Sequence, residues 1–100
     1  MKNLSVLAVV TLLAGAALAD GAATFKSKCA MCHGPDGKGQ TPVGKSMKAR
    51  DLGSREVQKQ TDAALSKTVA DGKGKMPGYK SSLGPGDIKQ VVVHIRTFKK

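Results

Sequence analysis

The sequence predicts an all-α protein that forms one small domain of about four short helices joined by loops. Apolar residues recur at helical spacing in several segments, and no segment alternates apolar and polar residues with the period of two typical of strands. Stretches rich in glycine and proline separate the helical segments. The chain has no internal repeat and no low-complexity tract, so we expect a single domain.

Residues 1–19 have the pattern of a cleaved export signal. Lys2 provides a basic start, and the apolar run that follows ends in the small-residue cleavage sequence Ala17-Leu18-Ala19. The run is shorter than the roughly 20 residues that a membrane-spanning helix needs, and no cysteine follows it for a lipid anchor. An uncleaved anchor is the alternative. Cleavage after Ala19 leaves residues 20–100 as the mature domain, which we expect in the periplasm.

The first predicted helix covers Gly21–Lys28. Asp20 can cap its start, where an acidic side chain is favourable beside the positive end of the helix dipole. Ala22, Phe25 and Cys29 fall on one face at helical spacing. Phe25 is therefore expected to face the same side as Cys29.

The middle of the chain carries weaker helix signals. Glycines and prolines predict a loop over residues 34–44, and residues 45–50 are compatible with one turn of helix. Ser54 can cap a short helical turn that extends to Gln60.

Two clearer helices follow. Thr61 is the predicted N-cap of the first, which has Asp62 in its first turn and Gly72 as its C-cap. Pro85 begins the second, at a position where its missing amide proton costs nothing. The predicted apolar stripes are Ala64, Leu65, Thr68 and Val69 in the first helix, and Ile88, Val91, Val92, Ile95 and Phe98 in the second.

The run Cys29-Ala30-Met31-Cys32-His33 has the C-x-x-C-H pattern of c-type haem attachment. Two thiols at this spacing can add to the two vinyl groups of one haem, and the histidine that follows is placed to ligate the iron. A redox cysteine pair, a disulfide and half of a zinc site are the alternatives. No βαβ pattern and no further cysteine supports them, and His94 lies far away in the sequence. One motif predicts one haem.

The composition also favours a cofactor. A domain of this size buries little apolar surface by itself, and its only aromatic residues are Phe25, Tyr79 and Phe98. A porphyrin would supply the missing apolar centre.

The chain carries a formal net charge of +10, which indicates acidic partners or surfaces. An exported protein without nucleic-acid-binding motifs is not expected to bind nucleic acid. Several lysines lie in the segments that must approach the haem, where they can gather around its exposed edge: Lys26, Lys28, Lys45, Lys48, Lys73, Lys75 and Lys80.

The candidates for the second axial ligand are Met31, Met47, Met76 and His94. Met31 lies inside the attachment motif, on the wrong side. Packing alone can account for Met47 and His94, so neither has to be an iron ligand. Met76 stands out because it lies in an irregular glycine-rich loop directly before Pro77, and a loop can carry a thioether across the haem.

Three segments resemble the class I cytochromes c of the small monohaem bacterial kind. They are the segment from Gly21 through His33, the run Gly-Lys-Met-Pro-Gly-Tyr at residues 74–79, and the amphipathic last helix. The resemblance implies a cytochrome c fold wrapped around one haem, with Met76 as the distal ligand. It also implies that the Pro42 carbonyl accepts a hydrogen bond from the ring of His33.

The sequence departs from the family in two places. The family has an aromatic residue where this chain has His94, in contact with the glycine that corresponds to Gly21. The chain also has no tryptophan, so any contact to the haem propionates must come from other donors, and Arg50, Tyr79 and the backbone are the candidates.

With His33 and Met76 on the iron, no position is open for oxygen or substrate. The expected function is that of a monomeric one-electron carrier without enzymatic activity and without stable membrane insertion, which exchanges electrons with acidic protein partners. The alternatives are a haem protein that binds or senses ligands at an open axial position, and a cytochrome subunit of a larger oxidoreductase complex.

Overall fold

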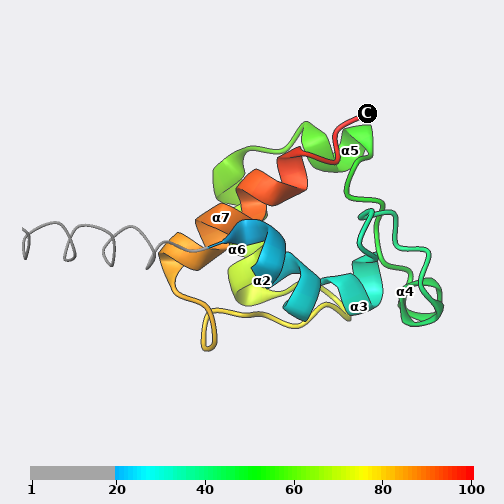
Figure 1. The fold of residues 1–100 in the computed structure, drawn as a ribbon, viewed down its shortest axis with the longest axis horizontal. Coiled ribbons are helices and arrows are strands. Elements are labelled where there is room, and N and C mark those ends of the chain that lie inside the picture. Colours follow the sequence, from blue (N-terminus) through cyan, green and yellow to red (C-terminus); the bar gives the residue numbers. More distant parts are fainter. Residues whose placement is uncertain (1–19) are drawn as a thin grey trace, which may run out of the picture.

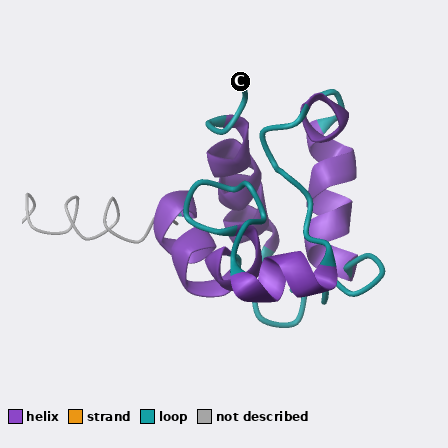
Figure 2. Ribbon diagram, turned by 90° about the vertical axis from the view of Figure 1, so that its right-hand side faces the viewer, coloured by secondary structure: helices purple, strands orange, loops and turns teal. Residues whose placement is uncertain are grey.

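The computed structural model describes residues 20–100, and the predicted export signal lies outside the described residues. Six helices make up this part, with no strand among residues 20–100 (Figure 1, Figure 2). The all-α prediction is therefore confirmed. The helices are α2 (Gly21–Lys28), α3 (Ala30–His33), α4 (Pro42–Met47), α5 (Arg55–Gln58), α6 (Asp62–Asp71) and α7 (Pro85–Arg96).

The predicted helix starts agree with the structure. Asp20 accepts hydrogen bonds from the amides of Ala22 and Ala23, at 3.1 and 3.3 Å, and so caps α2. Ser54 caps α5 and Thr61 caps α6 through their hydroxyls. Each of these side chains satisfies an amide that a helix start leaves without a backbone partner.

The chain between α3 and α5 differs from the prediction. The loop is shorter than residues 34–44 because α4 begins at Pro42, inside the predicted loop. Thr41 makes this possible, since its hydroxyl accepts a hydrogen bond from the Gly44 amide at 2.8 Å and also lies 2.9 Å from the Cys32 carbonyl. A threonine-proline pair is a helix-start signal of the same kind as Ser54 and Thr61.

Helices α2 and α7 pack directly against each other (Figure 1). Glycine is required at their crossing, because a Cβ on Gly21 would lie 2.0 Å from the carbonyl oxygen of Gln90. The backbone of Gln90 is thus the nearest neighbour of Gly21, and the expected contact between Gly21 and His94 stays a prediction. His94 packs between Phe25 and Phe98, with ring centroids 5.1 Å apart in each pair.

The core lies where α2, α6 and α7 meet. Phe25 and Val91 are its most buried side chains, with 1% and 0% of their surface exposed. The prediction for Phe25 and Cys29 is confirmed because both are buried, whereas Ala22 and Ala64 are exposed and lie outside the core. The other buried hydrophobic side chains are Leu52, Val57, Leu65, Val69, Leu83, Ile88, Val92 and Ile95.

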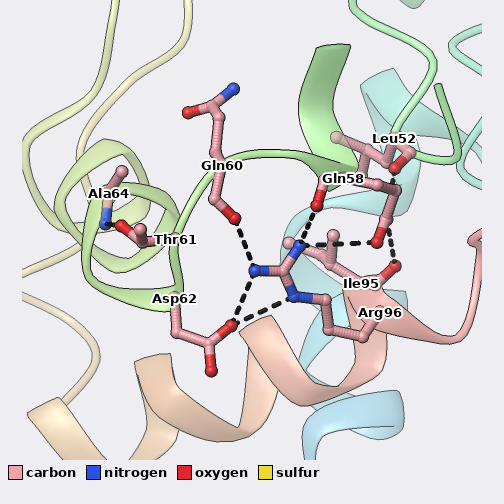
Figure 3. A network of polar contacts seen from close by, with 8 residues as sticks. All are labelled: Leu52, Gln58, Gln60, Thr61, Asp62, Ala64, Ile95 and Arg96. Atoms are coloured by element: carbon pink, nitrogen blue, oxygen red, sulfur yellow. Dashed lines mark hydrogen bonds and ion pairs between the residues drawn. The ribbon is translucent and has the colours of Figure 1, made fainter. Parts of the chain in front are cut away.

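A polar network joins the end of α7 to the chain between α5 and α6 (Figure 3). The Arg96 guanidinium donates to the carbonyl oxygens of Gln58 and Gln60, at 2.9 and 2.7 Å, and to the carboxylate of Asp62. The side-chain amide of Gln58 donates to the carbonyls of Leu52 and Ile95, at 2.7 and 3.0 Å. These bonds supply partners to carbonyls at the ends of α5 and α7 and in the neighbouring loops.

Candidate haem site

A cavity of about 370 Å³ lies against the core and contains most of the predicted site residues. Cys29, Cys32, His33 and Met76 all line it. Its apolar wall comes from core side chains of α2, α6, α7 and the chain around α5, namely Phe25, Leu52, Val57, Leu65, Val69, Val91 and Ile95. Residues that are far apart in the sequence are thus brought around one apolar space.

Cys29 lies at a bend between α2 and α3, and Cys32 lies within α3. Cys29 ends α2 with φ −113° and ψ −30°, and its carbonyl accepts the amides of both Cys32 and His33, at 3.3 and 3.0 Å. Both cysteines are free thiols rather than a disulfide. Burial raises the pKa of the Cys29 thiol to about 11, and the charge of Lys28 opposes this shift in part. The bend presents both sulfurs to the cavity.

His33 has the geometry of an iron ligand. Its Nδ1 lies 3.1 Å from the carbonyl oxygen of Arg50, and because a carbonyl only accepts, Nδ1 must carry the proton. Burial lowers the pKa of the imidazole, and the hydrogen bond to Arg50 offsets this in part. A neutral ring with Nδ1 protonated leaves the lone pair of Nε2 free for a metal.

The carbonyl that orients His33 is not the predicted one. Pro42 is the first residue of α4, where backbone carbonyls point along the helix axis toward its C-terminal end. The Arg50 carbonyl takes this role instead. The sequence carries no signal for this assignment, because any residue type offers the same carbonyl.

The segment that presents the Arg50 carbonyl is fixed by close backbone contacts. Lys48 ends α4 in the left-handed conformation, with φ 58°, and turns the chain back. A Cβ on Gly39 would lie 2.5 Å from the Ala49 carbonyl oxygen, so glycine is required there. The Leu52 amide donates to the Gly37 carbonyl at 2.7 Å. The glycine-rich loop and the Arg50 segment therefore support each other beside His33.

Met76 lies in a tight loop between α6 and α7. The backbones of Lys73 and Met76 exchange two hydrogen bonds, at 3.0 and 2.9 Å. Gly72 and Gly74 have φ values of 81° and 58°, which glycine adopts without strain. This small loop turns Met76 toward the cavity, where its side chain packs against the core.

The other candidates for the second axial ligand differ in their position relative to the cavity. Met47 also lines the cavity, so it lies near the site. Met31 has 74% of its surface exposed and does not line the cavity. His94 does not line it either, since its ring is held between Phe25 and Phe98. Met76 and Met47 are the two thioethers beside the cavity.

Tyr79 also lines the cavity, and its hydroxyl donates to the Lys28 carbonyl at 3.1 Å. Burial raises the pKa of this phenol. From the sequence, Tyr79 is a candidate contact for the haem propionates, and nothing there indicates this bond, which joins residues far apart in the chain. Arg50, the other propionate candidate, lines the cavity and lies 3.9 Å from Glu56.

Four of the lysines that were expected around the haem line the cavity, namely Lys28, Lys48, Lys73 and Lys75. Lys26 and Lys45 are exposed elsewhere, and Lys80 lies 3.6 Å from the carboxylate of Asp71. The basic side chains at the cavity thus come from three separate segments. We call these four lysines the cavity lysines.

The donor set fits haem c. Two thiols, one neutral imidazole and a thioether surround an apolar space, which is the chemistry needed to attach and ligate a haem. Among residues 20–100, no group of three or more His, Cys, Asp or Glu side chains is placed to hold a metal ion. No helix of the described part is long and apolar enough to cross a membrane.

Comparison with known proteins finds cytochromes c and a subunit of a cytochrome c oxidase. A family model described as "Cytochrome C oxidase, cbb3-type, subunit III" matches residues 16–95. Cytochrome c6 of Leptolyngbya boryana is 34% identical over 77 residues, which cover 77% of this chain and 87% of that protein. Cytochrome c6 of Synechocystis sp. is 32% identical over 78 residues, which cover 78% of this chain and 62% of that protein.

A longer relative and a solved structure add to this comparison. The cbb3-type cytochrome c oxidase subunit FixP of Azorhizobium caulinodans is 33% identical over 92 residues, or 85% of this chain but 30% of FixP. The solved structure of the KustC0563 c-type cytochrome matches with a TM-score of 0.75 and 32% identity. The match covers 81% of this chain and 99% of that one.

Proposed function

Because this chain belongs to the c-type cytochrome family and binds haem c covalently, we propose that it is an exported one-electron carrier with His33 and Met76 as axial ligands. The predicted cytochrome c fold is also confirmed by the solved relative. The observation that carries the proposal is the cavity, which brings the C-x-x-C-H cysteines, the His33 ring and the Met76 loop together. Cys29 and Cys32 are the proposed attachment residues.

Haem c, when bound, supplies an iron that cycles between Fe(III) and Fe(II). The residues of the chain orient the axial ligand and set the environment of this iron. The Arg50 carbonyl holds His33 in the tautomer whose Nε2 is free. The apolar walls exclude water and, together with a thioether ligand, favour the less charged ferrous state. With both axial positions filled, this arrangement suits electron transfer and leaves no position for a substrate, so we propose no enzymatic activity.

The cavity lysines support a proposal about partners. Lys28, Lys48, Lys73 and Lys75 come from three segments but border the same cavity, and no carboxylate lines it. A positive rim of this kind favours acidic redox proteins through long-range attraction. We infer a monomeric carrier that docks by this rim in the periplasm, after cleavage behind Ala19.

A second function is favoured by one set of observations. Both the matching family model and the FixP relative carry the name of a cbb3-type oxidase subunit. A domain like this one could therefore serve as the cytochrome part of a larger oxidoreductase complex. The fold and the axial ligands would be the same, and a stable complex isolated from the membrane fraction would favour this function over the free carrier.

Replacement of Met76 tests the axial assignment. Met76→Ala should remove the weak far-red absorption band of a ferric methionine–iron bond, lower the reduction potential and allow carbon monoxide to bind the ferrous protein. Met47→Leu is the control, because Met47 lines the same cavity, and it should leave the band and the potential unchanged. If Met47→Leu removes the band and Met76→Ala does not, Met47 is the ligand. Carbon monoxide binding by the unmodified protein would favour the ligand-sensing alternative.

A further inference from the structure

One hydrogen bond connects the Met76 loop to the helix that carries the first cysteine. The hydroxyl of Tyr79 donates to the carbonyl oxygen of Lys28 at 3.1 Å, between residues 51 positions apart. Among the hydrogen bonds of residues 20–100, it is the one that joins residues 72–80 to α2. Tyr79 is the third residue after Met76, and Lys28 directly precedes Cys29.

The Lys28 carbonyl is available because the chain bends at Cys29. In a continuous helix, the amide of Cys32 would donate to Lys28, four residues earlier. In this protein the Cys32 amide donates to the Cys29 carbonyl instead. Helix ends leave such carbonyls in need of another partner. The phenol of Tyr79 supplies it.

The backbone around Tyr79 is held at the same time by α6. The Tyr79 amide donates to the Val69 carbonyl at 2.9 Å, and the Lys80 amide donates to the Ala70 carbonyl at 3.1 Å. A Cβ on Gly78 would lie 2.6 Å from the Ala70 carbonyl oxygen, so the chain passes α6 in close contact. Tyr79 therefore ties one end of the Met76 loop to α6 and to the end of α2.

We propose that Tyr79 is a latch, a positioning residue whose hydroxyl keeps the Met76 loop closed over the haem cavity. This inference rests on the proposed role of Met76 as distal ligand. Because the latch reaches the residue beside Cys29, it couples the distal loop to the segment that attaches the haem. Opening of the loop and release of Met76 from the iron then require this bond to break.

The test is imidazole binding to the ferric holoprotein. Imidazole can bind only after Met76 leaves, so at saturating imidazole the observed rate equals the rate of loop opening. Tyr79→Phe removes the hydroxyl and keeps the ring. The usual contribution of one neutral hydrogen bond corresponds to an increase in opening rate of about 2-fold to 10-fold. If imidazole binding depends on Met76 but its saturating rate is unchanged in Tyr79→Phe, the latch is overturned.

Ser82→Ala is a matched control. The Ser82 hydroxyl donates to the Tyr79 carbonyl at 3.3 Å, so this variant also removes one hydroxyl bond from the same turn. It breaks no bond to α2, and its opening rate should equal that of the unmodified protein. If both variants accelerate opening equally, Tyr79 acts only through local stability, and the latch is wrong.

Hydrogen exchange separates failure of the latch from failure of the axial assignment. The amides of Lys73 and Met76 are bonded only within the loop, and in Tyr79→Phe they should exchange about 2-fold to 10-fold faster. If hydrogen exchange of these amides is faster in Tyr79→Phe, but imidazole binding depends on neither Tyr79 nor Met76, the latch stands and Met76 is not the ligand. If exchange of these amides is not faster in Tyr79→Phe, the latch is wrong, whichever residue ligates the iron.

Discussion

Arg96 and Asp62 form a paired contact across the fold: the Nε and Nη2 atoms of Arg96 lie 3.0 and 2.8 Å from one carboxylate oxygen of Asp62 (Figure 3). The same guanidinium also satisfies the carbonyls of Gln58 and Gln60. Arg96 is 30% exposed, whereas Asp62 is 77% exposed. The carbonyl bonds are therefore expected to matter more than the ion pair, which solvent screens.

Arg96→Lys should destabilise the protein although it keeps the charge. Lysine lacks the planar fork that reaches two carbonyls and a carboxylate together, and loss of these bonds should lower the free energy of unfolding by about 2 kcal/mol. Chemical denaturation of the holoprotein measures this change. Arg55→Lys is the control, because Arg55 is exposed on α5 and should change stability by less than about 0.5 kcal/mol. Equal effects of both variants would contradict the structural role of Arg96.

Folding of the chain should depend on the haem. The described core contains eleven buried hydrophobic side chains, and several of them also border the cavity. A double variant, Cys29→Ser with Cys32→Ser, cannot attach haem and should be largely unfolded, as small domains built around a metal centre are. Circular dichroism and thermal melting of this variant provide the measurement. A cooperative melting transition in the haem-free protein would disprove the dependence.

The cavity lysines should control the rate of electron exchange with acidic partners. Electrostatic attraction of this kind raises the association rate by about 10-fold to 1,000-fold at low salt. Charge reversal of Lys73 and Lys75 together should remove much of this increase. The increase should also disappear between about 0.1 and 1 M salt, where the Debye length falls from about 10 to about 3 Å. Stopped-flow kinetics with an acidic redox protein measures both effects.

The matched control reverses Lys89 and Lys99 together. Both lysines are exposed and neither lines the cavity, yet the change in net charge is the same. This control should slow the reaction much less, and both double variants should keep the visible spectrum of the unmodified protein. A rate that responds equally to both reversals would mean that net charge, rather than the cavity rim, governs association.

Asp51 should make stability depend on acid pH. The hydrogen bond from Lys100, at 2.7 Å, lowers the pKa of the Asp51 carboxyl, and the bond from the Gly53 amide adds to this. Because the pKa is lowered by folding, the stabilisation is complete above the unfolded value of about 3.9 and is lost as the pH falls through the folded value.

Denaturation curves between about pH 6 and pH 3 measure this dependence. Asp51→Asn and Lys100→Gln should each flatten the stability profile over the acid range, since each removes the same bond. The effect should be small because Lys100 is 62% exposed, so solvent screens the pair. A profile that is unchanged in both variants would show that Asp51 does not contribute to acid sensitivity.

Most of the helix starts and the haem-attachment motif could be predicted from local sequence patterns alone. Asp20, Ser54 and Thr61 marked helix starts because their side chains bond to nearby amides, a local interaction that neighbouring residues alone decide. The C-x-x-C-H run indicated the proposed attachment site for the same reason, since its residues lie within about one helical turn of one another. The start of α4 was missed although Thr41 and Pro42 carry a local signal of this kind.

The tertiary structure decided which backbone groups meet across the cavity. The Arg50 carbonyl, rather than that of Pro42, orients His33, and the Lys28 carbonyl receives the Tyr79 hydroxyl. Every residue carries the same carbonyl, so no residue type reveals these partners in the sequence. They follow from the bend at Cys29, the left-handed turn at Lys48 and the close passage at Gly39. Such long-range contacts form only once the helices have packed, because packing brings together carbonyls and donors that lie far apart in the chain.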